Sequence, residues 1–146
     1  MRIFLKAIFL AVIATALSLQ AQTAADSAAI KKAALDYVEG WYEGNAERME
    51  RAVHPELAKR IVRTDQNNRS RLEQMSAMTL VNGVKRGGGK DTPLAQQQKS
   101  VFILDIFQNT ASAKAVMSGW VDYMHLAKWN GEWKIVNVLW ELKQGQ

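Results

Sequence analysis

Apolar residues recur with a helical period near the start of the chain. The paired apolar positions are Ala29/Ile30, Ala33/Ala34, Tyr37/Val38 and Trp41/Tyr42. Pairs spaced every four residues, with charged residues between them, predict a long amphipathic helix with one broad apolar face. Thr23 and Asp26 have the spacing of a capping box at its start, and Gly44 suits its C-terminal end.

Two shorter helices are expected next. Asn45 can cap a helix that ends before Pro55, because proline disfavours helical geometry in the residue before it. Residues 58–64 predict a short strand and residues 65–69 a loop. Ser70 and Glu73 form a second capping-box spacing and predict a third helix, and the glycine-rich residues 85–93 predict a flexible loop. The apolar side chains expected to face inward from the third helix are Leu72, Met75, Met78 and Val81.

From Lys99 onward the pattern is that of strands. Three long strands are predicted, at residues 100–108, 112–129 and 132–143, with turns at Asn109-Thr110 and Asn130-Gly131. Asn-Gly between two apolar strands is a strong hairpin signal, because both turn residues need positive φ. The predicted fold class is α+β: three N-terminal helices packed on a strongly curved antiparallel sheet, cone-shaped, with an inner pocket.

Strict alternation along the strands divides their side chains between two faces. If Asn130-Gly131 is a two-residue turn, Trp129 pairs with Glu132, His125 with Val136 and Tyr123 with Val138. The face expected to pack on the helices carries Phe102, Leu104, Ile106, Ala113, Ala115, Met117, Val121, Tyr123, His125, Val136, Val138, Trp140 and Leu142, together with Lys134 near the hairpin end.

The opposite face is too apolar for a simple solvent face. Its predicted exposed patch consists of Trp120, Met124, Leu126, Trp133, Ile135 and Leu139. Contiguous apolar patches usually mark partner surfaces, so a homodimer through the outer sheet face is expected. The alternatives are that the C-terminal tail or a loop covers the patch, or that a bulge shifts the register.

The first 21 residues predict a secretory signal peptide. Arg2 and Lys6 precede an apolar stretch from Ala7 to Leu17, and Ala21 suits cleavage. The apolar stretch is about half the ~20 residues of a spanning helix, so no stable membrane anchor is expected, although a retained N-terminal anchor is the alternative. Residues 22–146 then form a single domain, secreted or periplasmic. The sequence contains no cysteine, so disulfides and thiol chemistry are excluded.

The charge of the chain is moderately basic. The formal net charge is +5, and removing Arg2 and Lys6 lowers it to +3 (5 − 2). Basic residues outnumber acidic ones over residues 59–99, which indicates a solvated surface or attraction to anionic ligands or membranes. The basic residues are not interleaved with aromatic ones, and no nucleic-acid-binding motif accompanies them, so no nucleic-acid partner is expected.

Two blocks carry a family resemblance: YVEGWYEGNAERMERAVHPELAKR (37–60) and VDYMHLAKWNGEWKIVNVLWE (121–141). With the order of elements, they resemble the nuclear-transport-factor-2-like (cystatin-like) α+β cone, and the chain is similar to small exported proteins grouped as "putative lumazine-binding". The resemblance implies a pocket between helices and sheet, and often dimerisation through the sheet. Relatives in that superfamily include ketosteroid isomerases, dehydratases, polyketide cyclases and proteins without catalysis, so the resemblance does not fix a reaction.

The candidate chemistry is that of a pocket without a decisive catalytic motif. A small, partly aromatic ligand is expected against Tyr42, Tyr123, His125 and Trp140. The alternative is a cyclase, isomerase or dehydratase that uses His125 or His54 as general base and Tyr123 as donor. A third alternative is a non-catalytic dimeric interaction protein. Two histidines are too few for a metal site, and no metal or cofactor is expected.

Overall fold

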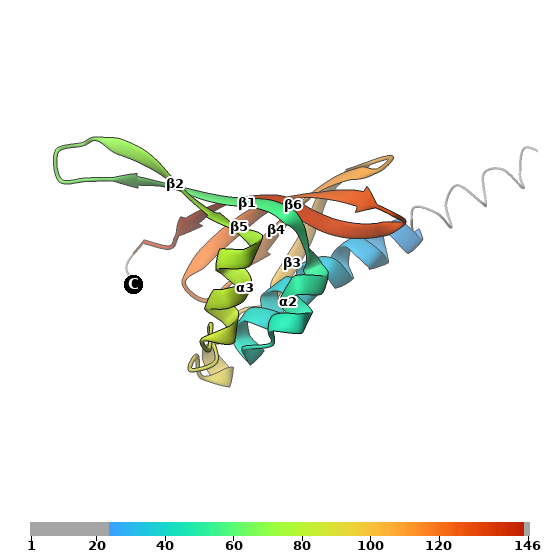
Figure 1. Cartoon of the computed structure of the whole chain (residues 1–146), viewed down its shortest axis with the longest axis horizontal. Helices are drawn as coiled ribbons and strands as arrows, with labels where there is room; N and C mark the ends of the chain where they lie inside the picture. Colours follow the sequence, from blue (N-terminus) through green and yellow to red (C-terminus); the bar gives the residue numbers. More distant parts are fainter. Residues whose placement is uncertain (1–23, 145–146) are drawn as a thin grey trace, which may run out of the picture.

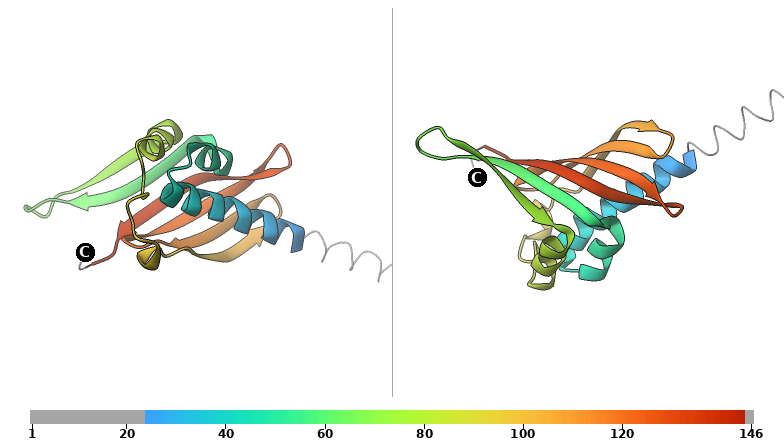
Figure 2. Two further views of the ribbon diagram at one scale, coloured as in Figure 1. Left: turned by 90° about the horizontal axis from the view of Figure 1, so that it is seen from below. Right: turned by 45° about the horizontal axis from the view of Figure 1, so that its top comes forward.

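Three α-helices lie against one face of a curved sheet in the computed structural model, which describes residues 24–144 (Figures 1 and 2). The first helix covers residues 24–43, and Gly44 at φ +62° turns the chain after it. The second helix, α2 (Ala46–Ala52), begins at Asn45, whose side chain accepts a 3.0 Å hydrogen bond from the Arg48 amide. Both predicted helices are confirmed. The predicted signal peptide lies outside the described residues.

The sheet contains six strands within the described residues. These are β1 (Val53–Thr64), β2 (Ser70–Ser76), β3 (Ser100–Phe107), β4 (Thr110–Val116), β5 (Trp120–Trp129) and β6 (Glu132–Leu142), and their spatial order is β2-β1-β6-β5-β4-β3. Strands β1 and β6 are parallel, and every other neighbouring pair is antiparallel. The α+β class with helices on a curved sheet is confirmed, but the sheet is mixed rather than wholly antiparallel.

The segment that the capping-box spacing assigned to the third helix begins as a strand. Residues 70–76 form β2, which pairs with β1 from Thr64↔Ser70 to Ala58↔Ser76. The tight turn between the two strands favours this pairing, because the Asp65 side chain accepts hydrogen bonds from the amides of Asn67 and Arg69. The third helix, α3 (Ala77–Lys85), starts only after this strand, and Ser76 rather than Ser70 is its N-cap. Of the four side chains expected inward, Leu72 and Met78 are exposed, whereas Met75 is half-buried and Val81 is buried.

The long strand predicted over residues 112–129 is two strands. The chain turns at residues 117–119, where the Met117 amide donates a 3.0 Å hydrogen bond to the Trp120 carbonyl, and β4 and β5 form a hairpin. The preceding hairpin turns at residues 108–109 rather than at Asn109-Thr110, because Phe107 pairs with Thr110. A bulge between Ile103 and Asp105 then turns Val101 and Ile103 toward the helices and leaves Phe102 and Leu104, both expected to face inward, half-exposed, whereas Ile106 packs on the core as predicted.

A bulge in the last hairpin reverses the predicted faces of β5. The Asn130-Gly131 turn is confirmed, and Trp129 pairs with Glu132. The register then shifts between Leu126 and His125, so that His125 faces Asn137 rather than Val136, and Tyr123 faces Leu139 rather than Val138. One extra residue in one strand exchanges the two faces of everything beyond it.

The bulge also removes the predicted outer patch. Met124, Leu126, Trp133 and Ile135 are buried against the helices, and Trp120 packs on the same core, so the placement of these five residues on an outer face is wrong. Leu139 alone of the six is exposed, at 50 %. The alternative in which a bulge shifts the register is the one that the structure bears out.

Ion pairs connect α2 to the first helix. Arg48 of α2 contacts Asp36, Glu39 and Glu43 on the first helix, with 2.8 Å to Asp36 and 2.7 Å to Glu43. Burial raises the pKa of Asp36, but hydrogen bonds from Lys32 and Arg48 outweigh it and lower that pKa overall.

No helix among residues 24–144 has the length and apolar character needed to cross a membrane.

Candidate functional site

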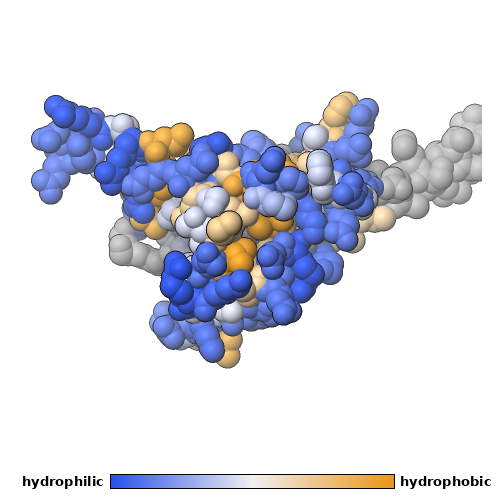
Figure 3. Space-filling view, viewed as in Figure 1, coloured by the Kyte–Doolittle hydropathy of each residue, from blue (hydrophilic) through white to orange (hydrophobic). Residues whose placement is uncertain are grey.

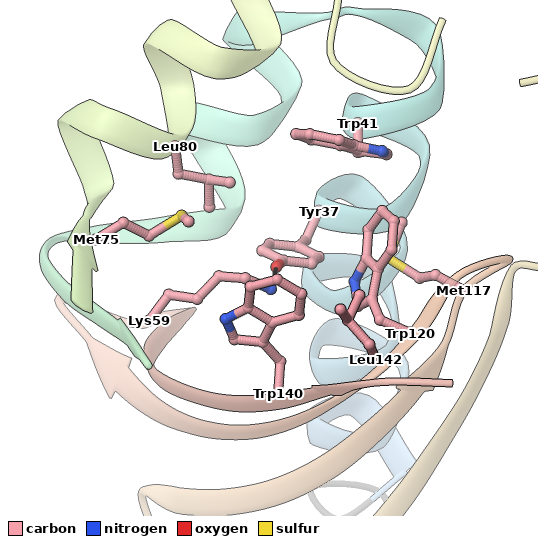
Figure 4. A pocket seen from close by; sticks show the side chains of 9 residues that line it. All are labelled: Tyr37, Trp41, Lys59, Met75, Leu80, Met117, Trp120, Trp140 and Leu142. Carbon is pink, nitrogen blue, oxygen red and sulfur yellow. Dashed lines mark hydrogen bonds between the residues drawn. The ribbon is translucent and has the colours of Figure 1, made fainter. Parts of the chain in front are cut away.

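A pocket of about 200 Å³ lies between the helices and the concave face of the sheet (Figure 4). Its lining residues are Tyr37, Trp41, Lys59, Met75, Leu80, Met117, Trp120, Trp140 and Leu142. They come from the first helix, α3 and five separate strands or turns, so the pocket exists only in the assembled fold. Figure 3 shows apolar residues gathered in the middle of this side of the molecule, above α2 and α3, with hydrophilic residues around them.

Three tryptophans form most of the aromatic wall. The rings of Trp41 and Trp120 meet edge to face at 5.6 Å, and those of Trp120 and Trp140 at 6.3 Å. Trp140 lies on the sheet side of the pocket and Trp41 on the helical side (Figure 4). Flat rings on opposite sides of a small cavity favour a planar or ring-containing occupant.

A buried ion pair closes the inner end of the pocket. Lys59 of β1 and Asp122 of β5 are 5 % and 0 % exposed and form a charge-assisted hydrogen bond. The Lys59 ammonium also donates to the Tyr37 hydroxyl at 2.7 Å, and the other Asp122 oxygen accepts from the Trp120 indole at 2.9 Å. The ammonium lies 4.8 Å from the centroid of the Trp140 ring, within range of a cation–π contact.

Burial displaces the titration of two of these groups. Desolvation lowers the pKa of Lys59, although the neighbouring Asp122 charge opposes that shift. Burial raises the pKa of Tyr37 well above its ordinary value, and the charge and hydrogen bond of Asp122 raise it further. The Tyr37 phenol is therefore a neutral hydrogen-bonding group at physiological pH.

A glycine-rich loop after α3 sets the position of Trp41. The Gly89 amide donates a 2.9 Å hydrogen bond to the Trp41 carbonyl, and a Cβ atom on Gly89 would lie 2.3 Å from the Trp41 indole nitrogen. Gly88 has φ +54°, and a Cβ there would lie 2.8 Å from the Trp41 carbonyl oxygen. The backbone of this loop therefore packs directly on Trp41, because a backbone can approach a side chain this closely only where the loop residue has no side chain of its own.

Of the four predicted ligand-binding residues, Trp140 lines the pocket. Tyr42 is buried beside it, where its hydroxyl accepts a 2.8 Å hydrogen bond from the Ser118 amide and braces the β4–β5 turn. Tyr123, 51 % exposed, and His125 lie on the outer face of the sheet, so their expected inward orientation is wrong. The His125 ring is 3.2 Å from the amide of Asn137.

The weaker catalytic candidates also lie away from the pocket. His54 packs edge to face on Trp129 with ring centroids 4.8 Å apart, and its Nδ1 atom accepts a 3.1 Å hydrogen bond from the Glu56 amide. The three residues proposed for acid–base chemistry, His54, His125 and Tyr123, are not brought together at the pocket that Trp140 lines. Residues 24–144 contain no group of three or more His, Asp or Glu side chains placed to hold a metal ion.

The sequence analysis missed Lys59, Asp122 and Tyr37 as a cluster. Asp122 alternates along its strand with Trp120, Met124 and Leu126. Lys59 alternates in the same way with Leu57 and Ile61. A charged residue between apolar neighbours on each of these two strand faces was a signal for a buried ion pair, because isolated charges are rarely buried.

The helices on a curved, unclosed sheet give this chain the fold described as nuclear-transport-factor-2-like, or cystatin-like. Solved structures with this fold superpose on most of the chain. A protein of unknown function from Shewanella baltica OS155 gives a TM-score of 0.62 at 19% identity, covering 84% of this chain and 97% of its own. A nuclear-transport-factor-2-like protein with a cystatin-like fold from Novosphingobium aromaticivorans gives a TM-score of 0.66 at 12% identity, covering 90% of this chain and 91% of its own. One from Silicibacter pomeroyi DSS-3 gives 0.63 at 15%, covering 83% and 98%.

The sequence itself places the chain more narrowly. Residues 25–141 match the family described as "Putative lumazine-binding", and the chain belongs to that family. No curated protein matches the sequence.

Proposed function

We propose that this chain is an exported protein that binds a small, ring-containing and mainly apolar molecule in the tryptophan-walled pocket. The observation that carries the proposal is the pocket of about 200 Å³ between Trp41, Trp120 and Trp140. Pockets for drug-sized ligands begin at about 300 Å³, so the occupant is a small molecule or the ring of a larger one.

The pocket offers a ligand few unoccupied polar groups. Two of the three Lys59 donors are directed to Tyr37 and Asp122, and the remaining lining is aromatic or aliphatic. Lumazine, after which the family is described, carries several donors and acceptors on its bicyclic ring. Most of them would lie against apolar side chains, which costs free energy. The pocket therefore favours a ring less polar than lumazine.

The enzymatic alternative with a histidine–tyrosine pair has no support in the geometry. His54, His125 and Tyr123 do not line the pocket, and the buried charges of Lys59 and Asp122 neutralise each other. Binding without turnover is the function that these residues favour.

Calorimetric titration with naphthalen-2-ylmethanol tests the proposal. We expect a Kd on the order of 10–1000 µM, as for a fragment-sized ligand. Trp140→Leu should weaken binding at least several-fold, whereas Trp129→Leu should not, because Trp129 is an exposed residue outside the pocket. Equal affinity of the two variants would contradict the proposal. Titration with lumazine, and native mass spectrometry of the purified protein, report on the natural ligand.

Export is part of the proposal and rests on the N-terminal 21 residues. Expression of the full chain in a Gram-negative host, followed by fractionation and N-terminal sequencing, tests it. Mature protein that starts near Gln22 in the periplasm is expected, and full-length protein in the cytoplasm would refute it.

Self-association through the outer sheet face is a second candidate property, with different residues from those of the sequence analysis. Strand pairing places Phe102, Lys114, Tyr123 and Leu139 in one row across β3, β4, β5 and β6, and its three apolar members are each about half-exposed. Such a row is unusual on a face that meets only water. Light scattering at micromolar concentration should give a dimer mass that Tyr123→Arg reduces to a monomer. A monomer in the unchanged protein would contradict it.

A further inference from the structure

We propose that the ligand of this pocket is an anion, whose carboxylate is held at the mouth of the pocket by Arg63. The inference rests on the proposed function, because it assumes a ring seated among the tryptophans. Arg63 does not line the pocket, but its guanidinium lies 5.7 Å from the centroid of the Trp140 ring that does.

The position of Arg63 follows from strand alternation along β1. Lys59, Ile61 and Arg63 share one face of that strand, and both charged side chains contact the same Trp140 ring. Lys59 is buried at the inner end, whereas the Arg63 side chain is 41 % exposed. Trp140 thus lies between an inner, neutralised cation and an outer cation that solvent can reach.

The Arg63 guanidinium has donors to spare. Within residues 24–144 its contact with Glu73 is a long ion pair of 3.7 Å, and it makes no hydrogen bond. The other oxygen of Glu73 is held at 2.7 Å by Arg71. Two guanidinium groups beside one carboxylate leave one positive charge uncompensated at this point.

These features select the chemistry of the ligand. A carboxylate could not enter the apolar interior without losing its hydration, but it can remain at the mouth while the ring enters. A planar guanidinium presents paired N–H donors that match the two oxygens of a carboxylate. A small aromatic acid, with its ring against Trp140 and its carboxylate at Arg63, satisfies both requirements.

The test compares naphthalene-2-carboxylate with naphthalen-2-ylmethanol at pH 7 by calorimetry. The two probes share the ring and differ in charge. We expect the unchanged protein to bind the carboxylate roughly threefold to tenfold more tightly, a modest preference because Arg63 is partly solvated. Arg63→Gln should abolish this preference by weakening binding of the carboxylate.

Arg60→Gln is the matched control. Arg60 lies on the same strand, but its side chain bonds Gln74 and Asn137 on the outer face, so the preference should survive its removal. No preference in the unchanged protein, or a preference that Arg63→Gln retains, would overturn the inference and leave the binding function standing. If neither probe binds, the proposed function fails and the inference fails with it.

Discussion

The ammonium of Lys59 lies 2.7 Å from the hydroxyl oxygen of Tyr37 and forms an ion pair with Asp122, although these residues come from β1, the first helix and β5. A buried lysine needs such partners, because an unpaired charge in an apolar interior is strongly destabilising. The cluster therefore fastens the helix to two non-adjacent strands at the inner end of the pocket.

Asp122→Asn should be one of the more destabilising single substitutions in the chain. It leaves the Lys59 charge buried without a counter-charge, and a loss of about 3–5 kcal/mol in the free energy of unfolding is expected. Urea unfolding followed by circular dichroism measures it. Asp105→Asn, on an exposed position of β3, is the control and should change stability by less than about 0.5 kcal/mol. A loss below about 1 kcal/mol for Asp122→Asn would refute the structural role of the pair.

The stability of the protein should decrease steeply at alkaline pH in a way that depends on Tyr37. Its pKa is raised in the folded state, so its contribution is complete below the ordinary value of 10.0 and is lost above it, where the unfolded chain ionises first. Tyr37→Phe should therefore flatten the decrease in the free energy of unfolding above pH 10. Lys59, whose pKa is lowered, contributes the opposite slope in both proteins. Identical alkaline slopes would argue against a buried Tyr37.

Arg48→Met should weaken the protein mainly at neutral pH. Arg48 donates to the carboxylate of Asp36, and removing bonds to a charged group costs about 1.5–3 kcal/mol. Because the pKa of Asp36 is lowered in the folded state, this contribution is present above its ordinary value of 3.8 and disappears as pH falls through the lower value. The two proteins should converge in stability toward pH 2. A constant difference from pH 7 to pH 2 would be inconsistent with this account.

The corrected register predicts a contrast between two tryptophans of the last hairpin. Trp133 is 5 % exposed and donates a 2.9 Å hydrogen bond to Asp26, whereas Trp129 is 54 % exposed. Trp133→Ala should cost about 3–5 kcal/mol and Trp129→Ala less than about 1 kcal/mol, measured by thermal unfolding. A larger loss for Trp129→Ala than for Trp133→Ala would instead favour the register without a bulge.

Substitutions of two glycines should have effects of opposite sign. Gly89→Ala places a methyl group against the Trp41 indole and should shift the tryptophan emission, lower stability and weaken binding of naphthalen-2-ylmethanol. Gly83→Ala meets nothing within 4 Å in the interior of α3 and should raise stability by about 0.5–1 kcal/mol. Equal effects of the two substitutions would mean that the loop does not constrain Trp41.

Much of the fold follows from local patterns in the sequence. The first helix, the Asn45 cap, the Asn130-Gly131 hairpin and the α+β class depend on local periodicity and turn chemistry, which a single chain displays. Strand β2 was predicted as helix, because its capping-box spacing competes with a pairing partner in β1 that local reasoning does not include.

The site was harder to predict, because an error of one residue in the register of a strand changes the predicted face of every later side chain on it. One bulged residue near Val136 moved Tyr123 and His125 to the outer face and Asp122 to the inner one. Trp140 lines the pocket on the inner face, where alternation had placed it. A sequence pattern that fixes each strand separately cannot place a site to which several strands contribute.

The parallel pairing of β1 with β6 has a consequence for how the chain folds. These strands are separated by most of the described sequence, yet Lys59 lies on one and Trp140 on the other. During synthesis the helices, β1 and β2 emerge well before β6, so the inner faces of these early elements have no complete partner until the final strand arrives. The pocket can therefore close only once β6, which carries Trp140, has paired with β1, which carries Lys59.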